Sequence, residues 1–211
     1  RKLKLLWFST QPQHFCRKLG YGCTVLRRNH CIERLMRIPW YIHGNWKLES
    51  TQLTDLENNI LKVGIYNDNL CTTYSIDCEE LGFLNNFYKD RVDEIAKDQT
   101  FYYNSSYSYE FWVQIYNQNA THGTHTHFGL GKNNIISFVH FLKTTDTKCL
   151  QFTDTKEIEI PQQEEGDFII FPSYVSHQVV SHTSNYNRIV VAGNIKLIQH
   201  ENQSRDVLPV N

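Results

Sequence analysis

Two stretches in the first half of the chain place apolar residues at helical spacing. Residues 51–62 (TQLTDLENNILK) have apolar side chains at positions i, i+3, i+7 and i+8, the spacing of one helix face: Leu53, Leu56, Ile60 and Leu61. A longer stripe runs through EELGFLNNFYKDRVDEIAK as Leu81, Leu84, Phe87, Tyr88, Val92 and Ile95. Asp77 precedes this stripe with Glu80 three residues later, which suits a helix N-cap. The pattern predicts helices over about residues 51–62 and 79–97.

Beyond residue 105 the pattern changes to short runs rich in β-branched and aromatic residues, separated by turn-forming residues. Glu165-Gly166-Asp167 and Pro172-Ser173 mark two of the turns. The runs cover residues 110–117, 135–143, 149–153, 157–160, 167–171, 177–181 and 188–196. Helices followed by many short strands predict a mainly β fold with supporting helices, either a buttressed β-sandwich or a jelly roll.

The electric charge of the chain is unevenly distributed. The 211 residues carry a formal net charge of −1, which by itself argues against a nucleic-acid-binding protein. Residues 1–37, however, hold nine Lys and Arg against one acid, Glu33. We therefore treat residues 1–40 as a basic N-terminal segment of unknown role. We expect one domain over residues 41–211, with helical support over about 50–100 and a β core over about 106–200.

Composition places the chain among globular proteins. Hydrophobic residues make up 40% of it, enough for a packed core. No run reaches the roughly 18 apolar residues of a membrane span, and no signal peptide is evident. The six cysteines include no C-x-x-C pair, so a zinc ribbon is disfavoured. We expect a cytoplasmic protein without a membrane partner.

The histidines gather in the β-rich half, where seven of the ten lie beyond residue 120. The segment THGTHTHFG contains His125 and His127 two positions apart, so on an extended strand both imidazoles could reach one metal ion. His177, after an apolar run and a proline turn, is the candidate third ligand from another strand. Arg188 opens an apolar strand eleven residues later, and burying it requires an anionic partner such as a dicarboxylate.

The ordered set of His125-x-His127, IISFVHFLK, EEGDFIIFPSYVSH ending at His177, and Arg188-Ile-Val-Val-Ala-Gly-Asn194 resembles the 2-oxoglutarate/Fe(II)-dependent oxygenases. It looks most like short marine-bacterial and phage members with an H-x-H motif, over about residues 110–196. The resemblance implies a double-stranded β-helix, the jelly roll of cupins, preceded by a helical segment. It also implies iron held by the histidines and 2-oxoglutarate bound by Arg188 through its distal carboxylate.

The implied reaction hydroxylates a substrate, either a peptidyl side chain or a small molecule, and releases succinate and carbon dioxide. Ascorbate is a candidate reductant. Gln114 and Tyr116 share one strand face ahead of the H-x-H motif and are candidate hydrogen-bond partners of 2-oxoglutarate. Asn194 shares the face of Arg188, six residues away, and joins them as a candidate. The sequence does not indicate the substrate or the oligomeric state.

Two other histidines are expected to have no role in metal binding. His122 is expected on a loop surface. His140 lies within the strand FVHFL, among apolar neighbours, and is expected to be a core or barrel-lining residue with satisfied hydrogen bonds.

One position departs from the family pattern. The usual iron site has two histidines and a carboxylate, with the acid two residues after the first histidine. That position is His127 in this chain. Either His127 replaces the acid and gives a site of three histidines, or it lies outside the coordination shell and leaves the third position open. Three neutral imidazoles would make the site one charge more positive than the usual triad.

Three alternatives stay open at this point. The first is a cupin-like metal-dependent dioxygenase that does not use 2-oxoglutarate and has no need of Arg188. The second is a non-catalytic β-sandwich, such as a binding or virion module. The third is nucleic-acid binding through residues 1–37.

Overall fold

The computed structural model describes residues 41–198, except for residues 75, 77–80, 101–105, 130–133 and 155–156. The predictions for the basic segment and for the Asp77 N-cap lie outside these residues. The described helices are α3 (Ser50–Val63) and α4 (Gly82–Thr100). The strands are β1 (Tyr41–Asn45), β2 (Ile65–Asn67), β3 (Leu70–Thr72), β4 (Ser106–Tyr116), β5 (His122–His125), β6 (Asn134–Lys143), β7 (Leu150–Phe152), β8 (Asp167–Pro172), β9 (His177–Val179) and β10 (Arg188–Ile198).

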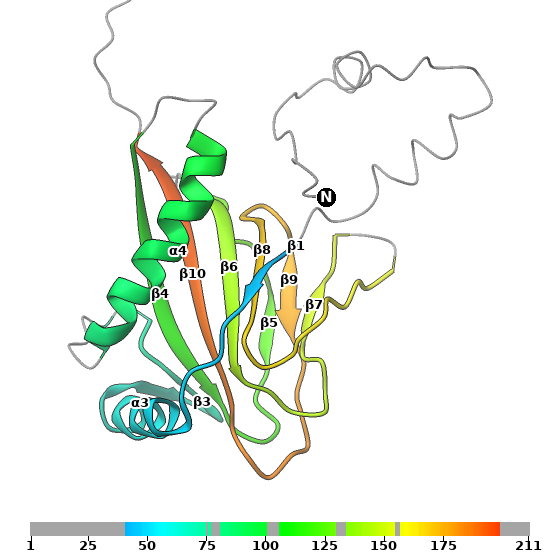
Figure 1. Ribbon diagram of the computed structural model, residues 1–211. Helices are drawn as coiled ribbons and strands as arrows, with labels where there is room; N and C mark the ends of the chain where they lie inside the picture. Colours follow the sequence, from blue (N-terminus) through cyan, green and yellow to red (C-terminus); the bar gives the residue numbers. More distant parts are fainter. Residues whose placement is uncertain are drawn as a thin grey trace, which may run out of the picture. The chain divides into compact units, whose positions relative to one another are not determined.

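The strands form two antiparallel sheets. The larger has the order β1-β8-β6-β10-β4-β3-β2, and the smaller has the order β5-β9-β7. Neighbours in the larger sheet are mostly far apart in sequence, as in the pairing of β10 with both β4 and β6. This arrangement of facing antiparallel sheets is the predicted jelly roll (Figure 1).

The central strand β10 divides the apolar core between its two faces. Ile189, Val191 and Ile195 pack with buried residues of α3 and α4, such as Leu56 and Tyr88. The alternate residues of β10 face the other way, where Val190 and Ala192 pack with residues of the smaller sheet. The helices therefore cover one face of the large sheet (Figure 1), and the smaller sheet packs against the other face.

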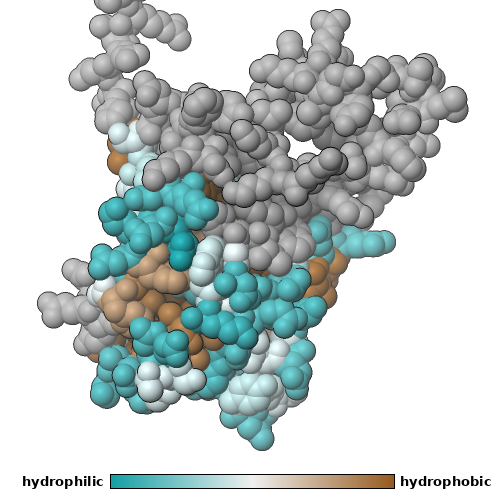
Figure 2. Space-filling model, in the orientation of Figure 1, coloured by the Kyte–Doolittle hydropathy of each residue, from teal (hydrophilic) through white to brown (hydrophobic). Residues whose placement is uncertain are grey.

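The outer side of the helices is mostly polar. Exposed residues of α3 include Gln52, Asp55 and Asn58, whereas Leu56 and Ile60 are fully buried. Figure 2 shows hydrophilic areas over much of this face, interrupted by hydrophobic areas, the broadest of which lies left of centre. This distribution follows the helical stripe in the sequence.

Gly193 allows two central strands to approach closely. A Cβ atom at this position would lie 2.2 Å from Cζ of Phe138 and 2.6 Å from the carbonyl oxygen of Glu110. The ring of Phe138 on β6 occupies the space that any larger residue of β10 would need. Glycine inside this strand thus has a packing reason.

His140 is a fully buried core residue, as predicted. Its Nε2–H donates to the carbonyl oxygen of Trp46 at 2.8 Å, and its Nδ1 accepts from the Tyr88 hydroxyl at 2.8 Å. Burial lowers the pKa of the imidazole to about 4, against a weaker opposing effect of backbone hydrogen bonds. The neutral form therefore joins β6 to α4 and to the segment after β1.

This burial predicts a loss of stability in mild acid. In the unfolded chain His140 has an ordinary pKa near 6.5. As the pH falls from about 6.5 to about 4, His140 is therefore protonated in the unfolded state but stays neutral in the folded state. We expect the free energy of unfolding to fall by up to about 3 kcal/mol over this range. The measurement is urea denaturation at pH 7 and at pH 4.5, compared between the parent and His140→Gln.

His140→Gln removes the titrating group but keeps a polar side chain, so its stability should depend less on pH than that of the parent. Equal pH dependence in the two proteins would contradict the assignment. The comparison isolates His140 because other buried histidines titrate in both proteins.

The predicted elements agree with the structure in most cases. The helix over residues 51–62 is confirmed by α3, and the one over residues 79–97 corresponds to α4. The strand predicted over residues 157–160 is wrong, because within the described part of that loop only Glu159 forms a β-bridge, to Phe152. The single-domain boundary at residue 41 stays a prediction.

Four short strands were not predicted. β1 pairs with β8, and β5 pairs with β9. The hairpin of β2 and β3 lies inside the segment expected to be helical support, and it turns at Asp68, whose φ is 50°. These strands have three to five residues, too few to show an apolar period.

Candidate metal centre

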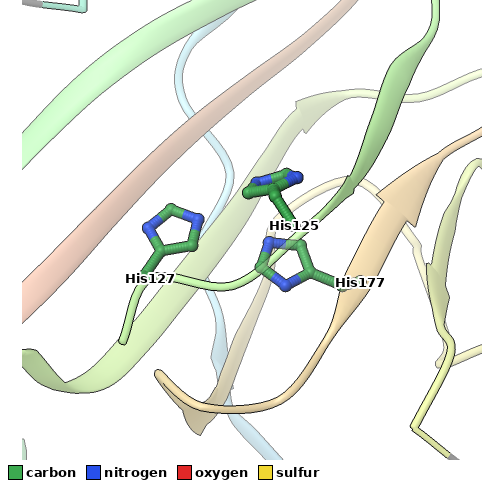
Figure 3. Close-up of side chains that lie close together, drawn as sticks. All are labelled: His125, His127 and His177. Carbon is green, nitrogen blue, oxygen red and sulfur yellow. The ribbon is translucent and has the colours of Figure 1, made fainter. Parts of the chain in front are cut away.

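Three histidines converge in the space between the two sheets. His125 is the last residue of β5, His127 lies in the bend that follows, and His177 opens β9. One ligand nitrogen from each residue lies within 4.8 Å of the others. The three rings surround one point in Figure 3. The structure thus brings together the three predicted metal ligands.

Strand pairing places two of these histidines. β5 and β9 are antiparallel, and His125 lies directly opposite His177 in their register. Opposite residues of an antiparallel pair project side chains to the same face. The prediction from the sequence had placed His125 and His127 on one extended strand, but the strand ends at His125.

Two main-chain carbonyls orient the imidazoles of His125 and His177. Nδ1–H of His125 donates to the carbonyl oxygen of Gly123 at 2.8 Å, and Nδ1–H of His177 donates to that of Val175 at 3.0 Å. Each bond leaves Nε2 of the ring with a free lone pair for a metal ion. Burial lowers the pKa of His177 to about 3, so the ring is neutral and able to bind a metal.

His127 is held through its backbone and by a neighbouring ring. Its N–H donates to the carbonyl oxygen of Ser173 at 2.9 Å, and its carbonyl oxygen accepts from Nδ2 of Asn134 at 2.9 Å. The Trp112 ring stacks on the imidazole, with 5.8 Å between ring centroids and 10° between planes. These contacts fix a residue that lies outside regular structure.

His122 is closer to the site than predicted. Instead of lying on a loop surface, it is a half-buried residue of β5. Its ring stacks on His125, with 4.3 Å between centroids and 18° between planes. Burial is the main cause that lowers its pKa. His122 lines the same cavity but does not belong to the group of converging ligand atoms.

The three histidines open into a cavity of about 400 Å³ between the sheets. This volume suits a small organic ligand. Arg188 lies in the cavity wall at the start of β10 and is only 2% exposed. Its guanidinium carbon lies 4.9 Å from the centre of the Tyr116 ring and 5.6 Å from that of Phe141.

Arg188 lacks a carboxylate partner among the residues that the structure describes. Its Nη1 has no hydrogen-bond partner, and no described acid forms an ion pair with it. Burial lowers its pKa, but arginine stays protonated in proteins. A buried cation without a counter-charge is costly, so this geometry suits an anionic ligand that enters the cavity.

Gln114 and Tyr116, the candidate partners of the cosubstrate, line the cavity that contains Arg188. In the register of β4 with β10, Tyr116 lies opposite Arg188 and Gln114 lies opposite Val190. The Tyr116 hydroxyl donates to Oε1 of Gln114 at 3.0 Å, and both side chains line the cavity. Burial raises the pKa of Tyr116 to about 12, which keeps its hydroxyl protonated.

Asn194 lines the cavity far from Arg188. Six residues of extended strand separate them by about 20 Å, at roughly 3.3 Å per residue. The Asn194 amide accepts from Oγ of Ser137 at 2.9 Å and donates to Glu110 at 3.1 Å. Both residues line the cavity, and a role of Asn194 in cosubstrate binding stays a prediction.

Known structures share this fold. No protein-family model and no curated protein matches the chain. A Pseudomonas putida prolyl-4-hydroxylase matches with a TM-score of 0.57 and 15% identity, over 78% of this chain and 96% of that one. A Trichoplax adhaerens prolyl hydroxylase, solved with a peptide fragment of hypoxia inducible factor, has a TM-score of 0.54 and 11% identity, over 84% of this chain and 94% of that one.

An oxidoreductase of the 2OG-Fe(II) oxygenase family from Burkholderia pseudomallei also matches. Its TM-score is 0.51 at 9% identity, over 83% of this chain and 93% of that chain. The chain has the fold of these oxygenases, a jelly roll, as the motif resemblance implied. The closer likeness to marine-bacterial and phage proteins gains no support. None of the described helices is long and apolar enough to cross a membrane, and a cytoplasmic location stays a prediction.

Proposed function

We propose that the chain is a 2-oxoglutarate- and Fe(II)-dependent oxygenase that hydroxylates a peptidyl side chain or a small molecule. One observation carries this proposal: three converging imidazoles and a buried arginine with an unsatisfied nitrogen share one cavity. The fold shared with solved 2-oxoglutarate oxygenases supports it. In this reaction, 2-oxoglutarate and dioxygen are consumed with the substrate, and succinate and carbon dioxide are released.

The residues of the site fit a divalent iron ion. Imidazole is a good ligand for iron, and the free Nε2 atoms of His125 and His177 point to a common centre with His127. These three residues would hold the ion, with His127 in place of the usual carboxylate. When bound, the iron activates dioxygen for oxidative decarboxylation of 2-oxoglutarate and oxidation of the substrate.

The other end of the cavity fits the cosubstrate. Arg188 would bind the distal carboxylate in a bidentate pair, which would supply the anion that its guanidinium lacks. The Tyr116 hydroxyl would donate a hydrogen bond to the same carboxylate, in place of the one that it donates to Gln114 in this structure. The apolar side chains of Leu150 and Val190 line the cavity here and exclude water.

The two main alternatives make different demands on these residues. A cupin-like dioxygenase without 2-oxoglutarate would use the histidines but would give Arg188 no anionic partner. A non-catalytic β-sandwich would require neither feature. The buried, unsatisfied Arg188 therefore favours the 2-oxoglutarate-dependent reaction.

Anaerobic titration with Fe(II) and 2-oxoglutarate tests the proposal. We expect a weak visible charge-transfer band only when both are present, and succinate release after oxygen is admitted. Zn(II) in place of iron is the control and should give no band. Raised thermal stability with Fe(II), but no band, would favour the cupin-like alternative, and no response to metal would favour a binding module. Ascorbate, a candidate reductant, can be added to the turnover assay.

A further inference from the structure

We infer that the cavity, once loaded with iron and 2-oxoglutarate, binds one more negative charge: an anionic group such as a carboxylate. The group belongs either to the primary substrate or to a small free anion. This inference rests on the proposed function and extends it by naming the charge of a further ligand. It follows from the charges of the side chains that line the cavity.

No carboxylate lines the cavity among the described residues, and Arg188 is the one lining side chain with a full charge. Glu110 does not line the cavity; it accepts a hydrogen bond from Asn194 in the cavity wall and forms an ion pair with Lys196 at 2.7 Å. The carboxylate of Asp154 accepts from the backbone N–H of Ser176 at 2.7 Å and does not line the cavity. The described protein atoms therefore provide no negative charge inside the site.

The three metal ligands contribute no negative charge either. Backbone carbonyls accept the Nδ1–H bonds of His125 and His177, so a ring that binds a metal ion through Nε2 keeps its Nδ1 proton and brings no negative charge. His127 occupies the position where a carboxylate would bring one negative charge. A divalent ion bound by three neutral rings keeps both of its positive charges.

The charges of the loaded cavity do not cancel. A divalent ion and Arg188 together carry one positive charge more than 2-oxoglutarate can neutralise as a dianion. With a carboxylate at position 127, the net charge of the metal ion, its ligands, Arg188 and 2-oxoglutarate would be zero. The inner part of the cavity has little contact with water, since Arg188 and His177 are 2% and 4% exposed. A net charge there is costly, and an additional anion would be attracted to the site and would lower that cost.

The shape of the cavity suits an anion with a flat apolar part. Trp112 stacks on His127, and the Tyr74 ring meets Trp112 edge-on, with 5.0 Å between centroids. Tyr74 is 46% exposed and lines the cavity, so an aromatic wall leads from the surface to the site. Benzoate and benzamide therefore form a suitable pair of probes, equal in shape and different in charge.

The experiment measures binding of these probes to the anaerobic protein loaded with Fe(II) and saturating 2-oxoglutarate. The readouts are calorimetric affinity and the position of the charge-transfer band. We expect benzoate to bind at least tenfold more tightly than benzamide and to shift the band without removing it. The affinities of acetate, acetamide and chloride are measured in the same way, and they distinguish an anionic group of the primary substrate from a small free anion. Benzoate at least tenfold tighter than chloride indicates a substrate carboxylate, and equal affinities indicate a free anion; both support an additional negative charge.

Two variants of one residue provide the matched control. His127→Asp restores the missing negative charge with a group that can bind iron, and should abolish the preference for benzoate. His127→Asn is isosteric with the aspartate variant but uncharged; measured at Fe(II) concentrations high enough to saturate its weakened site, it should keep the preference. Equal binding of benzoate and benzamide to the parent, or loss of the band because benzoate displaces 2-oxoglutarate, would overturn the inference. If no band forms with Fe(II) and 2-oxoglutarate alone, the proposed function itself fails, so the two failures are distinguishable.

Discussion

Replacement of His177 by alanine is expected to abolish formation of the iron and 2-oxoglutarate complex. His177 is 4% exposed, and within the described part of the chain the converging group contains only His125 and His127 besides it. Loss of an outer partner of a metal ligand already costs roughly 10–100-fold in metal affinity. Loss of the ligand itself should cost at least about 100-fold. Succinate release should fall to background.

Calorimetric titration with Mn(II), which is stable in air, measures the metal affinity of this variant. His122→Ala is the matched control, because His122 lines the same cavity and stacks on His125 but lies outside the converging group. It should retain metal affinity within about threefold of the parent. Circular dichroism verifies that both variants are folded. If His177→Ala binds Mn(II) as the parent does, the ligand assignment is wrong.

Replacement of Arg188 by methionine is expected to change stability and cosubstrate binding in opposite directions. In the ligand-free protein, methionine removes a buried cation that has an unsatisfied nitrogen, so the variant should be more stable than the parent. A gain of about 1 kcal/mol would raise the melting temperature by roughly 2–4 °C in a chain of this size. Affinity for 2-oxoglutarate should fall by about 100-fold or more, since removing one partner of a buried charge pair costs 2–5 kcal/mol.

Thermal denaturation with and without 2-oxoglutarate, in the presence of Mn(II), measures both effects in one series. Mn(II) binding itself should be unchanged, which separates the role of Arg188 from that of the histidines. Arg188→Lys keeps the charge but not the paired donors, and should bind 2-oxoglutarate with an intermediate affinity. An Arg188→Met protein that 2-oxoglutarate stabilises as strongly as the parent would exclude the proposed role.

The predictions from the sequence agreed best with the structure for long elements, because burial of one face gives them a repeating pattern of apolar residues. α3, α4 and the longer strands each show an apolar pattern that the two-sided packing of the large sheet explains. The short strands β1, β2, β3 and β5 depend on pairing with distant segments, which a local pattern does not contain. Residues 157–160 alternate like a strand, but Ile158 and Ile160 are exposed and no sheet face covers them.

The sequence predicted the metal ligands and Arg188, but not the neighbouring residues that hold the ligands in place. The order of His125, His127, His177 and Arg188 indicated one centre, and the structure brings the three imidazoles together in a cavity that contains Arg188. The stacking of Trp112 on His127 comes from a strand fifteen residues earlier and left no recognisable pattern. His122 was misplaced because nothing in the sequence shows that β5 begins there.

The hydrogen-bond acceptors that orient two of the histidines belong to the main chain, at Gly123 and Val175. A peptide carbonyl is present whatever amino acid the codon at that position specifies. Point mutations that exchange the side chain at Val175 can therefore alter local packing while the acceptor persists, provided the backbone keeps its path. The orientation of these two metal ligands therefore depends on the path of the backbone and tolerates side-chain substitutions at the acceptor positions. An alignment of related sequences would not identify these acceptors as conserved residues.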